Sequence, residues 1–101
     1  MISGNANTIE ACMKERGDRP VLCLRSETEE AVMRYAVGVS DTHPHLYSIY
    51  AEYSGGGKET IETIPAFSEE RDTAESFCAM LWRFGVTPLS LHAHYEDSLT
   101  P

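Results

Sequence analysis

The chain has 101 residues and a formal net charge of −8. This length allows one domain and leaves no room for a nucleotide-binding domain beside a catalytic domain. Nucleic acids and anionic membranes attract positively charged surfaces, so the negative charge argues against both as partners. We therefore expect neither a nucleic-acid partner nor a membrane.

The cysteines and the apolar segments indicate where in the cell the protein is located. Cys12, Cys23 and Cys78 are odd in number, lie far apart and form no C-x-x-C pair. No apolar run approaches the roughly 20 residues of a membrane span, and the first residues lack the apolar core of a secretory signal. We predict a cytoplasmic protein with reduced thiols and no cofactor.

Residues 1–26 are expected to form an N-terminal extension ahead of a single α+β domain at 27–101. Residues 6–16 allow a short helix with Ile9 and Met13 on one side, which Gly17 can end. Residues 21–24 are a brief apolar run, which indicates an edge strand or a strap over the core.

The next segment has two competing interpretations. Ser26 and Glu29 have the spacing of a capping box, which favours a helix from Glu27 to Val37. Residues 31–39, however, alternate between apolar side chains and smaller or charged ones, which is the period of a strand. We predict the strand, because β-branched and aromatic residues are frequent near its end.

A hairpin is predicted next. Residues 46–53 alternate, with Tyr47, Ile49, Ala51 and Tyr53 on one face and Leu46, Ser48, Tyr50 and Glu52 on the other. Three glycines at 55–57 supply the turn, and residues 58–64 form the partner strand. Pro65 either ends that strand or holds it at a sheet edge. We expect one face under a helix, with Tyr50 and Leu46 partly exposed on the other.

The strongest helix signal runs from Ser68 to Gly85. Its apolar residues recur at spacings of three and four and share one face: Ala74, Phe77, Cys78, Leu81 and Phe84. Ser68 is a suitable N-cap, Arg71 and Glu75 can pair, and Gly85 can end the helix. Met80 and Trp82 widen the apolar arc on both flanks, which indicates a second contact or a partner surface.

Residues 86–99 satisfy two conflicting rules. Thr87 and Pro88 mark a helix start, whereas Leu89 to Glu96 alternate as in a strand. In a strand, His92, His94 and Glu96 would line one face and suit Zn²⁺ or a related ion. In a helix, His92 and His94 would point about 200° apart and could not share a metal.

The second half of the chain resembles a family of unknown function, about 100 residues long, from clostridia-like Firmicutes. The similarity extends from Tyr35 to Leu99, with departures at Ala93, His94 and Ser98. It is carried by Tyr47-Ser48-Ile49, Thr63-Ile64, the acidic helix from Ser68, Val86-Thr87-Pro88, Leu91, Glu96-Asp97 and Leu99. The resemblance implies an α+β domain with a helical last segment, and it implies no activity. We accordingly predict a helix at 88–98.

We predict an α+β fold, with a small antiparallel sheet of about three strands, one amphipathic helix across it and a short C-terminal helix. No set of side chains indicates catalysis, so the leading hypothesis is a non-enzymatic interaction or accessory module. It would bind a protein partner or form a homodimer, through contact residues Leu46, Tyr50, Met80 and Trp82. The alternative hypothesis is a metal-binding protein that uses His92, His94 and Glu96.

Overall fold

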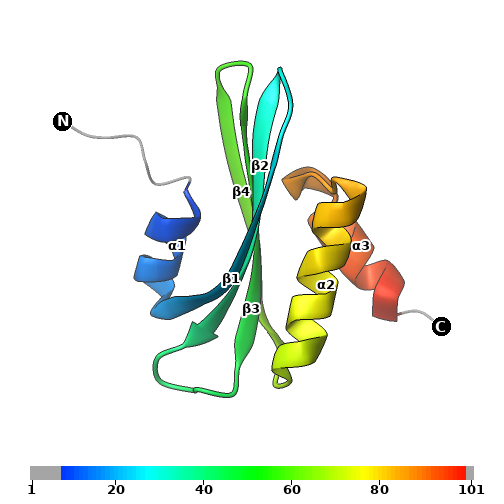
Figure 1. Ribbon diagram of the computed structural model, residues 1–101. Coiled ribbons are helices and arrows are strands. Elements are labelled where there is room, and N and C mark those ends of the chain that lie inside the picture. The colour runs from blue at the N-terminus through cyan, green and yellow to red at the C-terminus, as the bar shows by residue number, and fades with distance from the viewer. Residues whose placement is uncertain (1–7, 100–101) are drawn as a thin grey trace.

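The computed structural model describes the backbone of residues 8–99 and the side chains of residues 8–96. Four antiparallel strands form one sheet in the order β1-β2-β3-β4. The elements in chain order are α1 (Ile9–Arg16), β1 (Asp18–Glu27), β2 (Ala31–Ser40), β3 (Tyr47–Gly55), β4 (Lys58–Ser68), α2 (Arg71–Phe84), the 3-10 turn η2 (Pro88–Ser90) and α3 (Leu91–Leu99). Helix α1 lies on one face of the sheet, and α2 and α3 lie on the other (Figure 1). The α+β class is confirmed, with one strand more than the approximate number expected.

The expected N-terminal extension supplies the additional strand. β1 pairs with β2 from Asp18 opposite Ser40 to Glu27 opposite Val32, with an irregularity between Pro20 and Leu22. The short helix and the edge strand are both present, and residues 18–26 belong to the same sheet as the rest of the domain. Residues 6 and 7 of the expected first helix lie outside the described residues.

The competing helix at 27–37 is replaced by a turn and a strand. The Thr28 hydroxyl accepts hydrogen bonds from the backbone N–H groups of Glu30 and Ala31, at 3.2 and 3.1 Å. The Thr28 N–H donates to the Ala31 carbonyl at 2.8 Å. A threonine side chain that satisfies backbone groups in this way competes with helix formation. Of the apparent capping box, Ser26 lies in β1, where it pairs with Met33, and Glu29 lies in the β1–β2 turn, so no helix starts there and the predicted strand is confirmed.

The two central strands are buried on both faces. Tyr35, Val37, Ile49 and Ala51 point into the main core beneath α2. Ala36 and Tyr50 point to the opposite face, where Ile9 and Met13 of α1 cover them. The predicted alternation of β3 is therefore confirmed, but the expectation that Tyr50 is partly exposed is wrong. Its side chain is 0% exposed, because α1 packs across this face, and its hydroxyl donates to Asp18.

The β3–β4 hairpin turns at Gly56 and Gly57, whose φ angles are +58° and +76°. Positive φ at both central residues is what a two-residue hairpin loop requires, and glycine adopts it without strain. β4 passes through Pro65 and continues to Ser68 as an edge strand, next to a register shift in β3 between Tyr47 and Ile49. Proline is tolerated there because an edge strand leaves part of its backbone unpaired.

Helix α2 starts later than expected. Ser68 is the last residue of β4, and its hydroxyl accepts from the Glu70 N–H at 2.9 Å, so Glu70 rather than Ser68 is the N-cap. Gly85 adopts the left-handed conformation at the C-terminal end as predicted, and Arg71 pairs with Glu75 at 2.7 Å.

Four of the five predicted apolar positions of α2 are buried, namely Ala74, Phe77, Cys78 and Leu81. Phe84 is the exception, and its expected burial is wrong, because the side chain is 69% exposed. The chain turns at Gly85 directly after it, and Val86 enters the core instead.

The C-terminal segment is helical, as predicted, and η2 begins it at Pro88. Leu91 is buried at the start of α3. Tyr95 lies 5.5 Å from Phe67 and 6.4 Å from Phe77, measured between ring centroids, and this aromatic group joins α3 to β4 and α2.

Gly55 lies where the two hairpins meet, and we expect Gly55→Ala to destabilise the fold. An added Cβ would come within 2.6 Å of the Glu30 carbonyl oxygen and 2.7 Å of the Ala31 Cβ. Crowding of this kind lowers the free energy of unfolding by about 1–3 kcal/mol. Urea denaturation measures the change, and Ser54→Ala is the matched control. Equal stability of Gly55→Ala and the control would contradict the close approach.

Candidate interaction surface

The structure disperses the four predicted contact residues. Leu46 is partly buried in the loop before β3. Met80 is partly buried and packs against the main core, and Tyr50 lies inside the second core under α1. Trp82 is 43% exposed. Of the four, Trp82 therefore keeps the exposed apolar area that the predicted partner surface needs.

Trp82 is both exposed and fixed. Its indole N–H donates to the Arg25 carbonyl of β1 at 2.9 Å, which places the ring across one edge strand of the sheet. Edge strands leave backbone groups that can pair with another chain, and proteins protect them in several ways. The indole occupies one such carbonyl and holds the ring in one orientation.

Two further exposed apolar side chains follow Trp82 closely. Phe84 is 69% exposed and Leu89 is 86% exposed. Among the described residues, these three are the large hydrophobic side chains with high exposure. We name Trp82, Phe84 and Leu89 the apolar end. Sequence reasoning missed the exposure of Phe84 and Leu89. Phe84 lies in the last turn of a helix and Leu89 follows a helix-starting proline, and side chains at helix ends are often less buried than those in the middle.

The apolar end lies toward the end of the sheet that carries the two hairpin turns. Gly85 approaches the Met33 methyl group of β2, since a Cβ built there would be 3.7 Å from it. Leu89 borders a recess of about 280 Å³, together with Pro88, Tyr53 and Thr60. The segment after α2 therefore crosses the sheet near Met33 and Tyr53, and Figure 1 shows both hairpin turns extending beyond the C-terminal end of α2.

The nearby β1–β2 turn is acidic. Glu27, Glu29 and Glu30 are all exposed there. Arg25 pairs with Glu27 at 3.3 Å, which leaves an excess of negative charge at the turn. A positively charged partner would be attracted to this rim.

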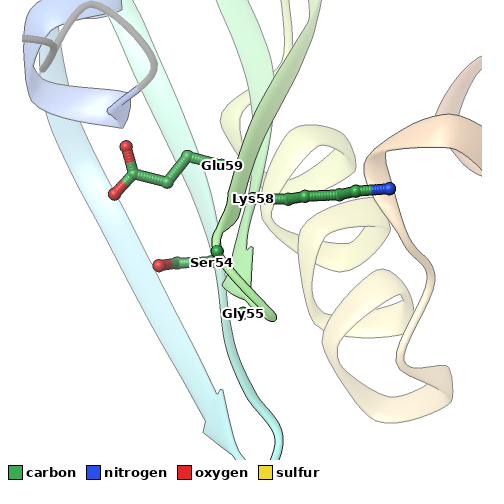
Figure 2. Close-up of a pocket in the computed structure, with 5 residues that line it drawn as sticks. Ser54, Gly55, Lys58 and Glu59 are labelled. Atoms are coloured by element: carbon green, nitrogen blue, oxygen red, sulfur yellow. The ribbon is translucent and has the colours of Figure 1, made fainter.

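The β3–β4 turn also borders a recess of about 450 Å³. Its side chains do not converge: in Figure 2, Ser54 and Glu59 point to one side of the strand and Lys58 points to the other. A small-molecule site needs polar groups directed at one point. The Lys58 stem instead borders the recess beside Leu89.

The predicted metal ligands lie on α3. Because residues on a helix are separated by about 100°, the His92 and His94 side chains diverge, and one ion cannot take both. His92 instead lies 3.5 Å from Glu62 of β4, and Glu96 follows one turn later on α3. Among the described residues, no group of three or more histidine, cysteine or acidic side chains has the geometry of a metal site. The three-ligand arrangement required a strand, and this segment is a helix.

Among the described residues, three buried groups have raised pKa values, namely Cys78, Tyr35 and Tyr50. The pKa of Tyr50 is raised by burial and by its hydrogen bond to Asp18. Burial raises the pKa of the Cys78 thiol to about 12 and that of the Tyr35 hydroxyl to about 12. Tyr35 donates to the Val86 carbonyl at 2.9 Å, which ties β2 to the segment after α2. A thiol with a raised pKa stays protonated at neutral pH, so Cys78 packs in the core and is not an activated nucleophile.

Comparisons with protein-family models, with curated proteins and with solved structures found no match to this chain. The resemblance to the family of unknown function therefore stays a prediction. Across residues 8–99, we find no helix with the length and apolar character needed to cross a membrane.

We expect Trp82→Phe to lower the free energy of unfolding by about 0.5–1 kcal/mol, the net value of one hydrogen bond at a partly exposed site. Phenylalanine keeps an aromatic ring but cannot donate to the Arg25 carbonyl. Chemical denaturation measures the change. Phe84→Leu, at an exposed neighbouring position, serves as the control and should stay within about 0.5 kcal/mol of the wild type. An identical effect of both substitutions would show that the indole hydrogen bond contributes nothing.

Thiol labelling at pH 8 should separate the cysteines by burial. Cys23 is exposed and Cys78 is buried, so N-ethylmaleimide should modify Cys23 in the folded protein and Cys78 only after unfolding in urea. Because the folded-state pKa of Cys78 is raised, its labelling at pH 8 is suppressed by both burial and protonation. Peptide mass spectrometry identifies the modified residue. Labelling of Cys78 as fast as Cys23 would mean that α2 opens readily.

Proposed function

We propose that this protein is a non-enzymatic interaction module and that the apolar end binds a partner protein. The supporting observation is the exposure of Trp82, Phe84 and Leu89 within one short segment. Single exposed hydrophobic residues are common on protein surfaces, whereas three within one short segment favour a contact surface there. Trp82 and Phe84 are two residues apart on α2 and face different sides of it, so a partner would wrap around the end of this helix. Tryptophan and phenylalanine are also enriched at the cores of interfaces.

The Trp82 ring and the backbone after Gly85 are held in place before any partner arrives. Trp82 is bound to the Arg25 carbonyl, and the Tyr35 hydroxyl holds the Val86 carbonyl. A contact surface that is already ordered loses less conformational entropy on binding. This order supports a surface that recognises a defined partner segment.

The charge of the surroundings favours a basic partner over a second copy of this chain. The whole chain carries a net charge of −8, and three exposed glutamates lie at the neighbouring β1–β2 turn. Two copies that met at this end would bring like charges together, which opposes association. We therefore infer a partner segment with apolar side chains flanked by lysine or arginine.

The experiment compares two synthetic peptides in about 0.15 M salt, where non-specific attraction is partly screened. One is a short amphipathic peptide of leucine and lysine, and the other has glutamate in place of every lysine. We expect the lysine peptide to shift the NMR signals of the Trp82 indole and the Leu89 amide, and the glutamate peptide to shift neither. The double variant Phe84→Ser with Leu89→Ser should weaken binding at least about tenfold, since both side chains are exposed contacts.

The matched control is Asp72→Asn in the first turn of α2, which removes one charge far along the helix from the apolar end. It should bind the lysine peptide as the wild type does. Equal affinity of the wild type and the double variant would reject the apolar end as the contact. A dimer in analytical ultracentrifugation that the double variant lacks would replace the basic partner with a second copy of the chain.

A further inference from the structure

Helix α1 is attached to the sheet by an ion network. The Arg34 guanidinium of β2 donates to the Glu52 carboxylate of β3 at 2.5 and 2.8 Å. It also donates to both carboxylate oxygens of Glu10 in α1, at 2.6 and 2.8 Å. Glu52 in turn accepts from the Ile9 N–H at 3.0 Å, at the first turn of α1. One arginine therefore joins the helix to the two central strands. The hydrogen bonds from Arg34 hold the pKa of the Glu10 carboxyl below its usual value.

The apolar contacts of α1 are few. Ile9 and Met13 are its two buried residues, and α1 has only eight residues. Isolated helices shorter than about 12–15 residues are marginal in water, so α1 depends on what holds it to the sheet. The main core under α2 includes no residue of α1. Opening of α1 would therefore leave that core intact.

The connection from α1 to the sheet is a single residue. Gly17 has a φ of +76° and no atom within 4 Å of the position that a Cβ would occupy. Glycine adopts this conformation without strain and gives the backbone its greatest freedom at this point. The Gly17 carbonyl accepts from the Asp41 N–H at 2.8 Å, which ties the start of β1 to the sheet. β1 begins directly afterwards at Asp18, whose carboxylate accepts from the Tyr50 hydroxyl. The hinge and the anchored strand are adjacent.

We propose that α1 is a latch that opens separately from the rest of the fold, that the Glu10–Arg34–Glu52 network closes it, and that opening uncovers a second apolar surface. That surface consists of Ala36, Tyr50 and the partly buried Ile61, which α1 covers in the closed state. It lies on the face of the sheet opposite α2 and α3, so the proposal is independent of the apolar end (Figure 1). Local opening of this kind is common where buried apolar contacts are few.

Hydrogen exchange followed by mass spectrometry or NMR tests the latch. In the wild type, the amides of α1 should exchange at least about tenfold faster than those of β2 and β3, since a local opening needs less free energy than global unfolding. Glu10→Gln should accelerate exchange in α1 a further twofold to fivefold, roughly the value of an exposed ion pair. The matched control is Glu15→Gln, an exposed position on the same helix, which should change nothing.

A disulfide provides the second test. The Cys12 sulfur lies 3.9 Å from the Thr63 hydroxyl oxygen of β4, so Thr63→Cys places two thiols side by side. Prepared with Cys23→Ser to prevent other pairings, the oxidised variant should slow α1 exchange to the rate of the central strands, and reduction should restore the fast rate. The dye 1-anilinonaphthalene-8-sulfonate, which binds exposed apolar surface, should fluoresce more with Glu10→Gln and less with the oxidised variant.

Two results would overturn the latch. Exchange of α1 at the same rate as β2 and β3 in the wild type would show that the helix opens only with global unfolding. Equal effects of Glu10→Gln and Glu15→Gln would show that the network does not close it. Faster exchange in α1 alone, reversed by the disulfide, would support the proposal.

Discussion

The fold depends on the burial of β2 and β3 on both faces. Tyr35 and Ile49 point to one side, whereas Ala36 and Tyr50 point to the other, and all four are fully buried. A sheet with only one helical layer would leave Tyr50 in water. The sheet must therefore be covered twice, by α2 and α3 on one face and by α1 on the other. This requirement makes α1 the cover of a second, smaller core that is separate from the main core under α2.

The two covers differ in how they are held. α2 contributes four buried residues, and α3 joins it through Tyr95 and the aromatic contacts with Phe67 and Phe77. α1 contributes two buried residues and relies on Arg34, which is shared between Glu10 and Glu52. Apolar burial does not depend on charge state, whereas an ion network weakens when one partner is neutralised or screened. The attachment of α1 to its face of the sheet is therefore more sensitive to pH and salt than the packing of α2 and α3 on the other face.

The surface proposed for binding arises from the way in which α2 ends. Gly85 turns the chain before the apolar face of α2 is complete, and Val86 fills the core in place of Phe84. Phe84 and Leu89 are left outside, and Trp82, which precedes Phe84 by two residues, is bound to β1. The same turn that closes the main core leaves these apolar side chains exposed at the C-terminal end of α2. The burial of Val86 and the exposure of Phe84 and Leu89 both follow from the turn at Gly85.

The sequence by itself determined three local elements: the strand at 31–39, the alternation along β3 and the end of α2 at Gly85. These follow from backbone periodicity and from the conformations that glycine and proline allow, which neighbouring residues largely decide. The residues alone left the C-terminal segment open, because Leu89 to Glu96 alternate as in a strand, and its helix was predicted from the family resemblance. Only the tertiary structure decided that Tyr50 is covered, that Phe84 is exposed and that Ser26 of the apparent capping box lies in β1. An alternating pattern states which side chains share a face, but their burial depends on which distant element lies across that face. For Tyr50 that element is α1, whose short and weakly patterned sequence carries no signal of where it docks.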